Sequence, residues 1–257
     1  MKKYIILSLS LIFVILSTRA QNMTTYPSGV RKLIKAYSSQ IKGYNGFSII
    51  MYDGSEIRYH ERTEKSHKDL MDSSDLSDIF AYDYMKGKSG VIPKNQDPGR
   101  IRNEELLMKM YGATLSEVQQ NLVTIIWCPY LVNQKLRVTK INGVDKQLQK
   151  ISDELDKHPE LKDYLHSAGT FNWRKVRGAE RLSAHSFGTA IDLNVKYSNY
   201  WQWDCRCTSE DVDLKYKNRI PQQIVDVFEK YGFIWGGKWY HYDTMHFEYR
   251  PELLVDL

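Results

Sequence analysis

The chain has 257 residues, which suits one domain or one domain with a sizeable extension, and 42% of them are hydrophobic, enough for a real core. The formal net charge is +5, but Lys2, Lys3 and Arg19 lie within the first 20 residues, which hold no acid. Without these three, the basic residues fall from 36 to 33 against 31 acidic ones, so the net charge falls to +2. The charge therefore gives no support for a nucleic-acid partner, and we expect none.

Residues 1–20 have the pattern of a secretory signal peptide. A basic start is followed by an apolar run from Tyr4 to Leu16, and the small residues Thr18 and Ala20 stand three and one before a cut. The alternative is a single membrane anchor, but the run is short for a membrane span. We therefore expect a secreted or periplasmic protein that has no stable membrane span after cleavage.

Residues 21–100 carry few regular patterns. Residues 29–37 predict a short helix, and Asp53-Gly54 between two β-rich runs predicts a hairpin with a tight turn. Residues 65–83 mix charged and apolar side chains, which indicates a loop with one helical turn. Residues 87–99 are rich in glycine and proline and are expected to be irregular.

From Asn103 onward the local signals become clearer. Asn103 can cap one helix, and Thr114-x-x-Glu117 is a capping box for a second. The later predicted elements are strands over residues 122–127 and 136–140, a helix over 144–165 that Pro159 should interrupt, and a helix between Pro221 and Gly232.

The stretch from Ser183 to Asp192 holds two candidate metal ligands, His185 and Asp192. Asp192 follows His185 by seven positions, which would span roughly 23 Å in a fully extended chain, whereas both side chains must reach one ion through bonds of about 2 Å. The chain must therefore turn between them, and Gly188 can adopt the backbone angles that a turn needs. After the turn, residues 190–195 alternate as a strand does, with Ile191, Leu193 and Val195 expected to face the core.

A third candidate ligand, His246, follows Asp243 by three residues. In a regular strand an odd separation would point the two side chains to opposite faces. We therefore expect Asp243 in a turn just before a strand, from which both side chains can reach the metal region. His185, Asp192 and His246 are two imidazoles and one carboxylate, the ligand chemistry of a catalytic zinc that keeps a fourth position open.

These residues resemble a known family of zinc peptidases. Ser183-x-His-x-x-Gly-x-Ala-x-Asp192, followed by Asp243-x-x-His246, is similar to the signature of the zinc D-Ala-D-Ala carboxypeptidases and L-alanyl-D-glutamate peptidases, which share their fold with the hedgehog signalling domain. The resemblance implies that His185, Asp192 and His246 bind Zn²⁺.

The resemblance also implies roles for residues around the metal. Asp243 would be the catalytic base, and Ser183 would hold a ligand or the substrate by a hydrogen bond. Arg174 is the best candidate for an upstream arginine that steadies the substrate carbonyl, although Arg177 and Arg181 lie close by in sequence. His241, two residues before Asp243, could contact substrate or orient the base, with a packing role as the alternative.

The expected architecture is α+β, with helices packed on a small, mainly antiparallel sheet that carries the zinc site. Residues 136–257 would form the zinc peptidase catalytic region. Residues 21–135 would form an N-terminal segment, or an integral wall of the same domain.

The remaining cysteines and histidines carry weaker signals. Three cysteines are too few for a disulfide framework, so we expect free thiols, with one bridge from Cys128 to Cys205 or Cys207 as the alternative. Four histidines lie outside any ligand spacing and are expected at the surface: His60, His67, His158 and His166.

The sequence thus predicts a secreted zinc metallopeptidase that hydrolyses the stem peptides of peptidoglycan. Because the acid before His246 is Asp, as in the endolysin-like endopeptidases, we expect cleavage between L-Ala and D-Glu. The alternatives are a D-Ala-D-Ala carboxypeptidase of the same family, a non-catalytic zinc-binding module, a wall-binding protein that uses its aromatic residues without turnover, and a zinc peptidase that acts on proteins.

Overall fold

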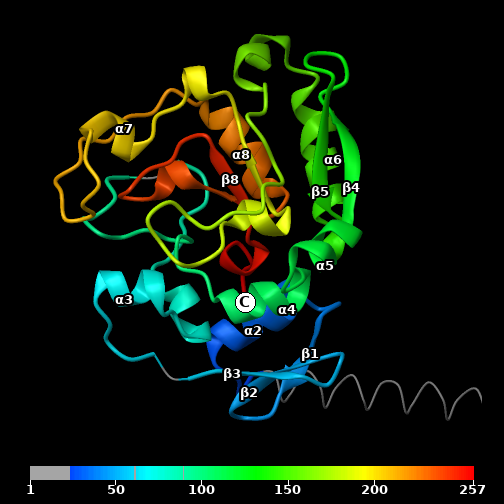
Figure 1. Cartoon of the computed structure of the whole chain (residues 1–257), viewed down its shortest axis with the longest axis vertical. Helices are drawn as coiled ribbons and strands as arrows, with labels where there is room; N and C mark the ends of the chain where they lie inside the picture. The colour runs from blue at the N-terminus through cyan, green and yellow to red at the C-terminus, as the bar shows by residue number, and fades with distance from the viewer. Residues whose placement is uncertain (1–23, 61, 89) are drawn as a thin grey trace, which may run out of the picture.

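The computed structural model describes residues 24–257 apart from 61 and 89, so the signal peptide predicted over residues 1–20 lies outside the described part (Figure 1). Helices alternate with small antiparallel sheets, which agrees with the predicted α+β class. Within the described residues, every helix is too short or too polar to cross a membrane.

The N-terminal part begins with a helix and a three-stranded antiparallel sheet of order β1-β2-β3. Its elements are α2 (Ser28–Ala36), β1 (Ile41–Tyr44), β2 (Ser48–Met51) and β3 (Glu56–Arg58). The predicted hairpin joins β2 to β3, and Gly54 in its turn has a φ of +85°, which favours glycine. The apolar side of α2 buries Leu33 and Ile34.

Four short helical segments follow: α3 (His67–Asp72), the 3₁₀ helix η1 (Leu76–Phe80), α4 (Glu104–Tyr111) and α5 (Leu115–Gln120). The two predicted caps are present. The side chain of Asn103 accepts a hydrogen bond from the backbone N–H of Leu106 at 2.8 Å, and Thr114 and Glu117 form the capping box of α5.

A β-hairpin packed against a helix forms one side of the molecule (Figure 1). Its elements are β4 (Leu122–Trp127), β5 (Gln134–Thr139), the 3₁₀ helix η2 (Ile141–Gly143) and α6 (Val144–Leu155). The helix predicted to continue to residue 165 ends at Leu155, because Pro159 starts a separate 3₁₀ helix, η3 (Pro159–Tyr164). The domain boundary predicted near residue 135 falls inside β5, which pairs with β4 along its whole length.

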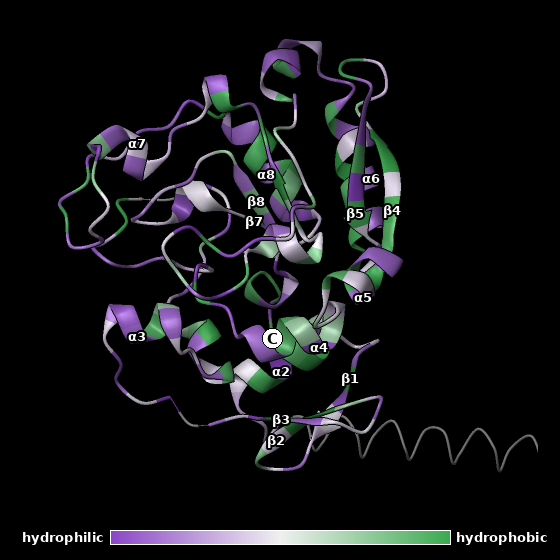
Figure 2. Ribbon diagram, viewed as in Figure 1, coloured by the Kyte–Doolittle hydropathy of each residue, from purple (hydrophilic) through white to green (hydrophobic). Residues whose placement is uncertain are grey.

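The third sheet lies between these parts and has the antiparallel order β6-β8-β7. The elements of this region are η4 (Ala184–Phe187), β6 (Ala190–Asp192), η5 (Val195–Tyr197), α7 (Trp201–Cys205), α8 (Gln222–Lys230), β7 (Phe233–Trp235), η6 (Gly236–Lys238), β8 (His246–Tyr249) and η7 (Pro251–Leu253). Helix α8 has a mixed surface (Figure 2), and its apolar side covers the sheet, with Phe228 stacked on Phe247 at 3.9 Å between ring centroids.

One hydrophobic core runs through all of these parts. It includes Val30 of α2, Trp127 of β4 and Leu254 near the C-terminus. Helix α2 packs against η7, and the Tyr37 hydroxyl that follows α2 donates a hydrogen bond to Glu252 at 2.6 Å. The N-terminal segment is therefore packed against the last residues of the chain.

Two sequence expectations in this region were wrong. Cys205 and Cys207 form a disulfide with each other, while Cys128 is a buried free thiol. Val195 was expected to face the core but is 43% exposed, because the strand ends at Asp192 and Asn194 caps a 3₁₀ helix instead. The polar cap thus overrides the apolar alternation.

Candidate metal and catalytic centre

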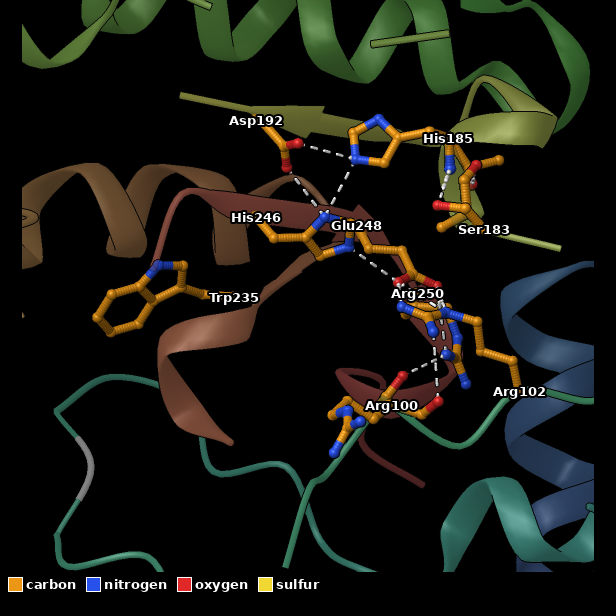
Figure 3. A network of polar contacts seen from close by, with 12 residues as sticks. Arg100, Arg102, Ser183, His185, Asp192, Trp235, His246, Glu248 and Arg250 are labelled. Atoms are coloured by element: carbon orange, nitrogen blue, oxygen red, sulfur yellow. Dashed lines mark hydrogen bonds and ion pairs between the residues drawn. The ribbon is translucent and has the colours of Figure 1, made fainter. Parts of the chain in front are cut away.

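The three predicted metal ligands meet at one end of the β6-β8-β7 sheet (Figure 3). His185 lies in η4, and Asp192 and His246 are direct cross-strand partners on β6 and β8. The His185 Nε2 atom lies 3.2 Å from Asp192 Oδ2 and 3.3 Å from His246 Nδ1, and that Nδ1 lies 3.1 Å from Asp192 Oδ1. Two imidazole nitrogens and one carboxylate therefore face one point.

A left-handed turn at Gly188 brings His185 and Asp192 together. Gly188 has a φ of +67°, and a Cβ atom there would lie 2.7 Å from the Leu122 side chain and 3.0 Å from the backbone nitrogen of Thr139. No L side chain fits this position without a shift of β4 or β5. The predicted turn is thus present, and the neighbouring hairpin holds it tightly.

The outward nitrogens of both histidines have partners that set their orientation. His185 Nδ1 lies 2.5 Å from the backbone oxygen of Thr170, and His246 Nε2 lies 3.2 Å from Glu248 Oε2. A proton on each outward nitrogen leaves the inward nitrogen with a free lone pair, as a metal ligand requires. The donor set and its supporting contacts therefore fit a zinc ion.

Charges around the cluster shift the pKa of its members strongly. Burial opposes protonation of His246, but the carboxylates of Asp192 and Glu248 outweigh it and raise its pKa to about 9. Burial would raise the pKa of Asp192, yet His185 and His246 hold it well below its usual range. The negative carboxylate and the two imidazoles thus favour a positive charge at their centre, which a proton or a metal cation can supply.

Two arginines hold Glu248 in place, one from a distant part of the chain and one from two residues further on. The Arg102 Nε atom donates to both Glu248 oxygens, at 2.8 and 2.9 Å, and Arg250 Nη1 lies 3.4 Å from Oε1 (Figure 3). Burial would raise the pKa of Glu248, but Arg102 and His246 keep it well below its usual range. The glutamate therefore stays ionised as a hydrogen-bond acceptor for His246.

Asp243 lies in a turn just before β8, as the sequence indicated. The backbone N–H of His246 donates to its carbonyl at 3.2 Å, and Trp235 Nε1 donates to the Thr244 carbonyl inside the turn at 2.9 Å. Asp243 Oδ1 is buried and has no hydrogen-bond partner among the described residues. Burial, with a smaller contribution from Asp192, raises the pKa of Asp243 to about 7, and a nearby cation would lower it again.

A cleft of about 350 Å³ opens onto the cluster. It is lined by every residue that the sequence predicted for the site: Arg174, Ser183, His185, Asp192, His241, Asp243 and His246. Aromatic side chains form another part of the wall: Tyr200, Trp201, Trp203 and Trp239. A cleft with an aromatic wall and a few converging polar groups is the usual form of a ligand site.

The three predicted substrate contacts differ in their surroundings. Arg174 is exposed at the cleft, and its Nη1 donates to the Lys175 carbonyl at 3.3 Å. Ser183 is buried and caps η4. His241 is fully enclosed, with Nδ1 2.7 Å from Asp97 Oδ2 and Nε2 2.9 Å from the Glu210 carbonyl. Both ring nitrogens of His241 are thus engaged away from Asp243, which matches the packing alternative.

Sequence reasoning missed the polar network behind His241. Arg100 lies 2.6 Å from both Asp97 and Glu210, and His67, expected at the surface, lies 2.9 Å from Glu210. The expectation for His67 was therefore wrong. A signal did exist, because a turn over Asp97-Pro-Gly-Arg100 places its first and last residues on the same side, within reach of one another.

Comparison with known proteins points to the same chemistry. Residues 177–249 match a family model described as D-alanyl-D-alanine carboxypeptidase. No curated protein and no solved structure matches the chain. The match spans His185, Asp192, Asp243 and His246, whereas Arg174 lies just before it. Over this stretch, which is less than a third of the chain, the sequence is similar to the D-alanyl-D-alanine carboxypeptidase family.

Proposed function

We propose that this protein is a secreted or periplasmic zinc peptidase that hydrolyses a bond in the stem peptides of peptidoglycan. The convergence of His185, Asp192 and His246 beside Asp243, whose Oδ1 is buried and has no partner among the described residues, carries this proposal. The family match supports a peptidase, and the small antiparallel sheet that carries the candidate ligands Asp192 and His246 is compatible with the fold implied by the motif resemblance.

The residues divide the chemistry among them. A zinc ion held by the three ligands would act as a Lewis acid and lower the pKa of water there to about 7. The Asp243 carboxylate is placed to accept a proton from the attacking water and to return it to the leaving amine nitrogen. The Arg174 guanidinium, at the cleft, would stabilise negative charge that develops on the scissile carbonyl oxygen.

Two bonds in the stem peptide compete as the site of cleavage. The acid before His246 is Asp, as in the endolysin-like members, which favours an endopeptidase acting between L-Ala and D-Glu. The alternative is removal of the terminal D-Ala, which agrees with the description of the matching family model. We favour the endopeptidase because Asp243 is one methylene shorter than the Glu of the carboxypeptidase-like members.

The decisive experiment is digestion of purified muropeptides with the zinc-loaded mature protein, followed by mass measurement of the products. Cleavage between L-Ala and D-Glu is expected. Release of free D-Ala alone would reverse the choice of bond. No product from protein shown to hold zinc would favour the non-catalytic zinc-binding module.

The Asp243→Ala variant tests the role of the base. We expect zinc content to equal that of the wild type, because Asp243 contacts none of the three ligand atoms among the described residues. Turnover should fall by about 10²- to 10⁴-fold, the usual contribution of a general base. Unchanged turnover in the zinc-loaded variant would rule out this role.

A further inference from the structure

Five arginines line the cleft beside the candidate metal ligands. Arg174 and Arg177 are exposed, whereas three are partly buried: Arg100, Arg102 and Arg181. Arg100 is paired with Asp97 and Glu210, and Arg102 with Glu248. These two guanidinium groups are therefore neutralised by buried or half-buried carboxylates. They serve the framework of the site and have few donors left for a ligand.

Arg181 differs from its neighbours because it has no carboxylate within ion-pair distance among residues 24–257 that the structure describes. Its Nη1 donates to the backbone oxygen of Arg100 at 3.0 Å, and its Nη2 lies 3.8 Å from the sulfur of Met71. Its Nε is buried and has no partner in the same described set. Burial, together with the charges of Arg102 and Arg100, lowers its pKa to about 9.

A largely buried guanidinium without a paired carboxylate is unfavourable, because desolvation is not repaid by an ion pair. The charges of Glu210 and Asp72, which lie beyond ion-pair distance, offset this only in part. The main chain nevertheless fixes Arg181 in this position. Its carbonyl accepts from the Val176 N–H at 2.9 Å, and the next N–H, of Leu182, donates to Glu104 at 2.7 Å. Since Arg181 lies on the wall of the cleft, an anionic ligand entering there can supply the missing partner.

We propose that Arg181 binds the free α-carboxylate of the substrate residue that provides the leaving amine. The inference rests on the proposed function. Both candidate bonds share this feature, since a terminal D-Ala has a free α-carboxylate and D-Glu is joined onward through its side-chain carboxyl. In an ordinary polypeptide the same carboxyl is part of an amide bond. Arg181 would thus select stem peptides over proteins by a charge-assisted contact.

The test compares two peptides that differ in one group. One is the stem peptide with the free α-carboxylate after the scissile bond, and the other carries an α-carboxamide there. Wild-type protein should cleave the carboxamide peptide with a kcat/KM about 10- to 100-fold lower than that for the free-carboxylate peptide. This is the loss expected when hydrogen bonds to a charged group are removed. Arg181→Gln should lose this preference, and Arg181→Lys should keep part of it.

Arg177→Gln is the matched control, since Arg177 is an exposed arginine on the wall of the same cleft. The Arg177→Gln variant should keep the preference for the free-carboxylate peptide. If the preference depended only on the total positive charge of the cleft, Arg177→Gln and Arg181→Gln would lose it to the same extent. Calorimetric binding of both peptides to Asp243→Ala protein, with and without Arg181→Gln, gives the same comparison without turnover.

The outcomes separate the two proposals. If zinc-loaded wild-type protein cleaves neither peptide, the proposed function fails. If it cleaves both equally well, the function stands and the carboxylate site is wrong. If Arg181→Gln still prefers the free acid, another group binds it and the assignment to Arg181 is overturned. Should Arg181→Gln fail to fold, the wild-type comparison and the Arg181→Lys variant decide the question.

Discussion

Two buried glutamates contact Arg250, but only one of them reaches the candidate metal ligands. Glu248 lies 3.4 Å from Arg250 Nη1 and 3.2 Å from His246 Nε2, whereas Glu252 lies 2.5 Å from Arg250 Nε and accepts from Tyr37. Both carboxylates are almost completely enclosed. The pair therefore allows a metal-directed effect to be separated from a purely structural one.

Glu248→Gln should weaken zinc binding by about 10- to 100-fold, because the carboxylate that orients His246 and increases its basicity is lost. Glu252→Gln should leave the zinc Kd close to the wild-type value while lowering the free energy of unfolding. The zinc Kd is measured by competition with a chelator, and unfolding by urea titration. Equal zinc affinity in the two variants would show that Glu248 does not support the metal site.

Among single residues, the aspartates illustrate how strongly surroundings control charge. Asp192 lies between two histidines, which lower its pKa and keep it ionised. Asp243 lines the same cleft, but burial raises its pKa to about 7. One carboxylate is suited to hold a cation and the other to exchange a proton. This difference depends on burial and neighbours rather than on residue type.

At the scale of elements, the turn between η4 and β6 is the critical junction. It reverses the chain between the first and second metal ligands, and Gly188 packs against the β4–β5 hairpin so closely that a Cβ would overlap Leu122. The Thr139 N–H also donates to the Gly188 carbonyl at 3.1 Å. The hairpin thus positions His185 although it contributes no ligand.

Gly188→Ala should destabilise the protein more than Gly143→Ala, although both glycines have similar positive φ values of +67° and +71°. A Cβ at Gly143 meets nothing within 4 Å, so the cost there is the left-handed backbone alone, about 1 kcal/mol. At Gly188 overlap with the hairpin adds about 1–3 kcal/mol and should also weaken zinc binding. Urea unfolding and zinc titration of both variants check this, and equal effects would refute the packing argument.

At the scale of the whole molecule, the N-terminal segment completes the site. Arg102 reaches Glu248 on β8, and Asp97 accepts from the backbone and ring of His241. The C-terminal end of the chain in turn packs against α2. These contacts join parts of the chain more than 140 residues apart, so the cleft forms only when the whole fold is present.

The Asp97 contacts also predict how stability depends on pH. Burial would raise the pKa of Asp97, but Arg100 and His241 outweigh it and lower the pKa to about 2, compared with about 3.9 in an unfolded chain. The ionised form therefore stabilises the fold above about pH 4, by on the order of 2 kcal/mol, and this contribution disappears as the pH falls toward 2.

Urea unfolding of wild type and Asp97→Asn between pH 6 and pH 2 measures this contribution. The wild type should be more stable at pH 6, and the difference in free energy of unfolding should shrink as the pH falls. Titrating groups common to both proteins cancel in the comparison. A difference that stays constant over the whole range would mean that Asp97 is not the group that titrates.

The sequence by itself determined the local features of this protein. The caps at Asn103 and Thr114, the turn at Gly188 and the spacing of the metal ligands depend on interactions between residues close in the chain, so they could be predicted from patterns. The position of Asp243 before its strand follows from the same local geometry. Local rules failed at Val195, where a polar cap ended the strand earlier than the apolar alternation indicated.

Only the tertiary structure decided which distant charges meet. The pairing of Arg102 with Glu248 and the lack of an ion-paired carboxylate at Arg181 depend on contacts between segments far apart in sequence. The residues next to each arginine in the chain do not show which of them will be paired. The same holds for His67, whose partner Glu210 is 143 positions away. Burial and the sum of neighbouring charges give each of these groups its role, and both quantities exist only once the chain has folded.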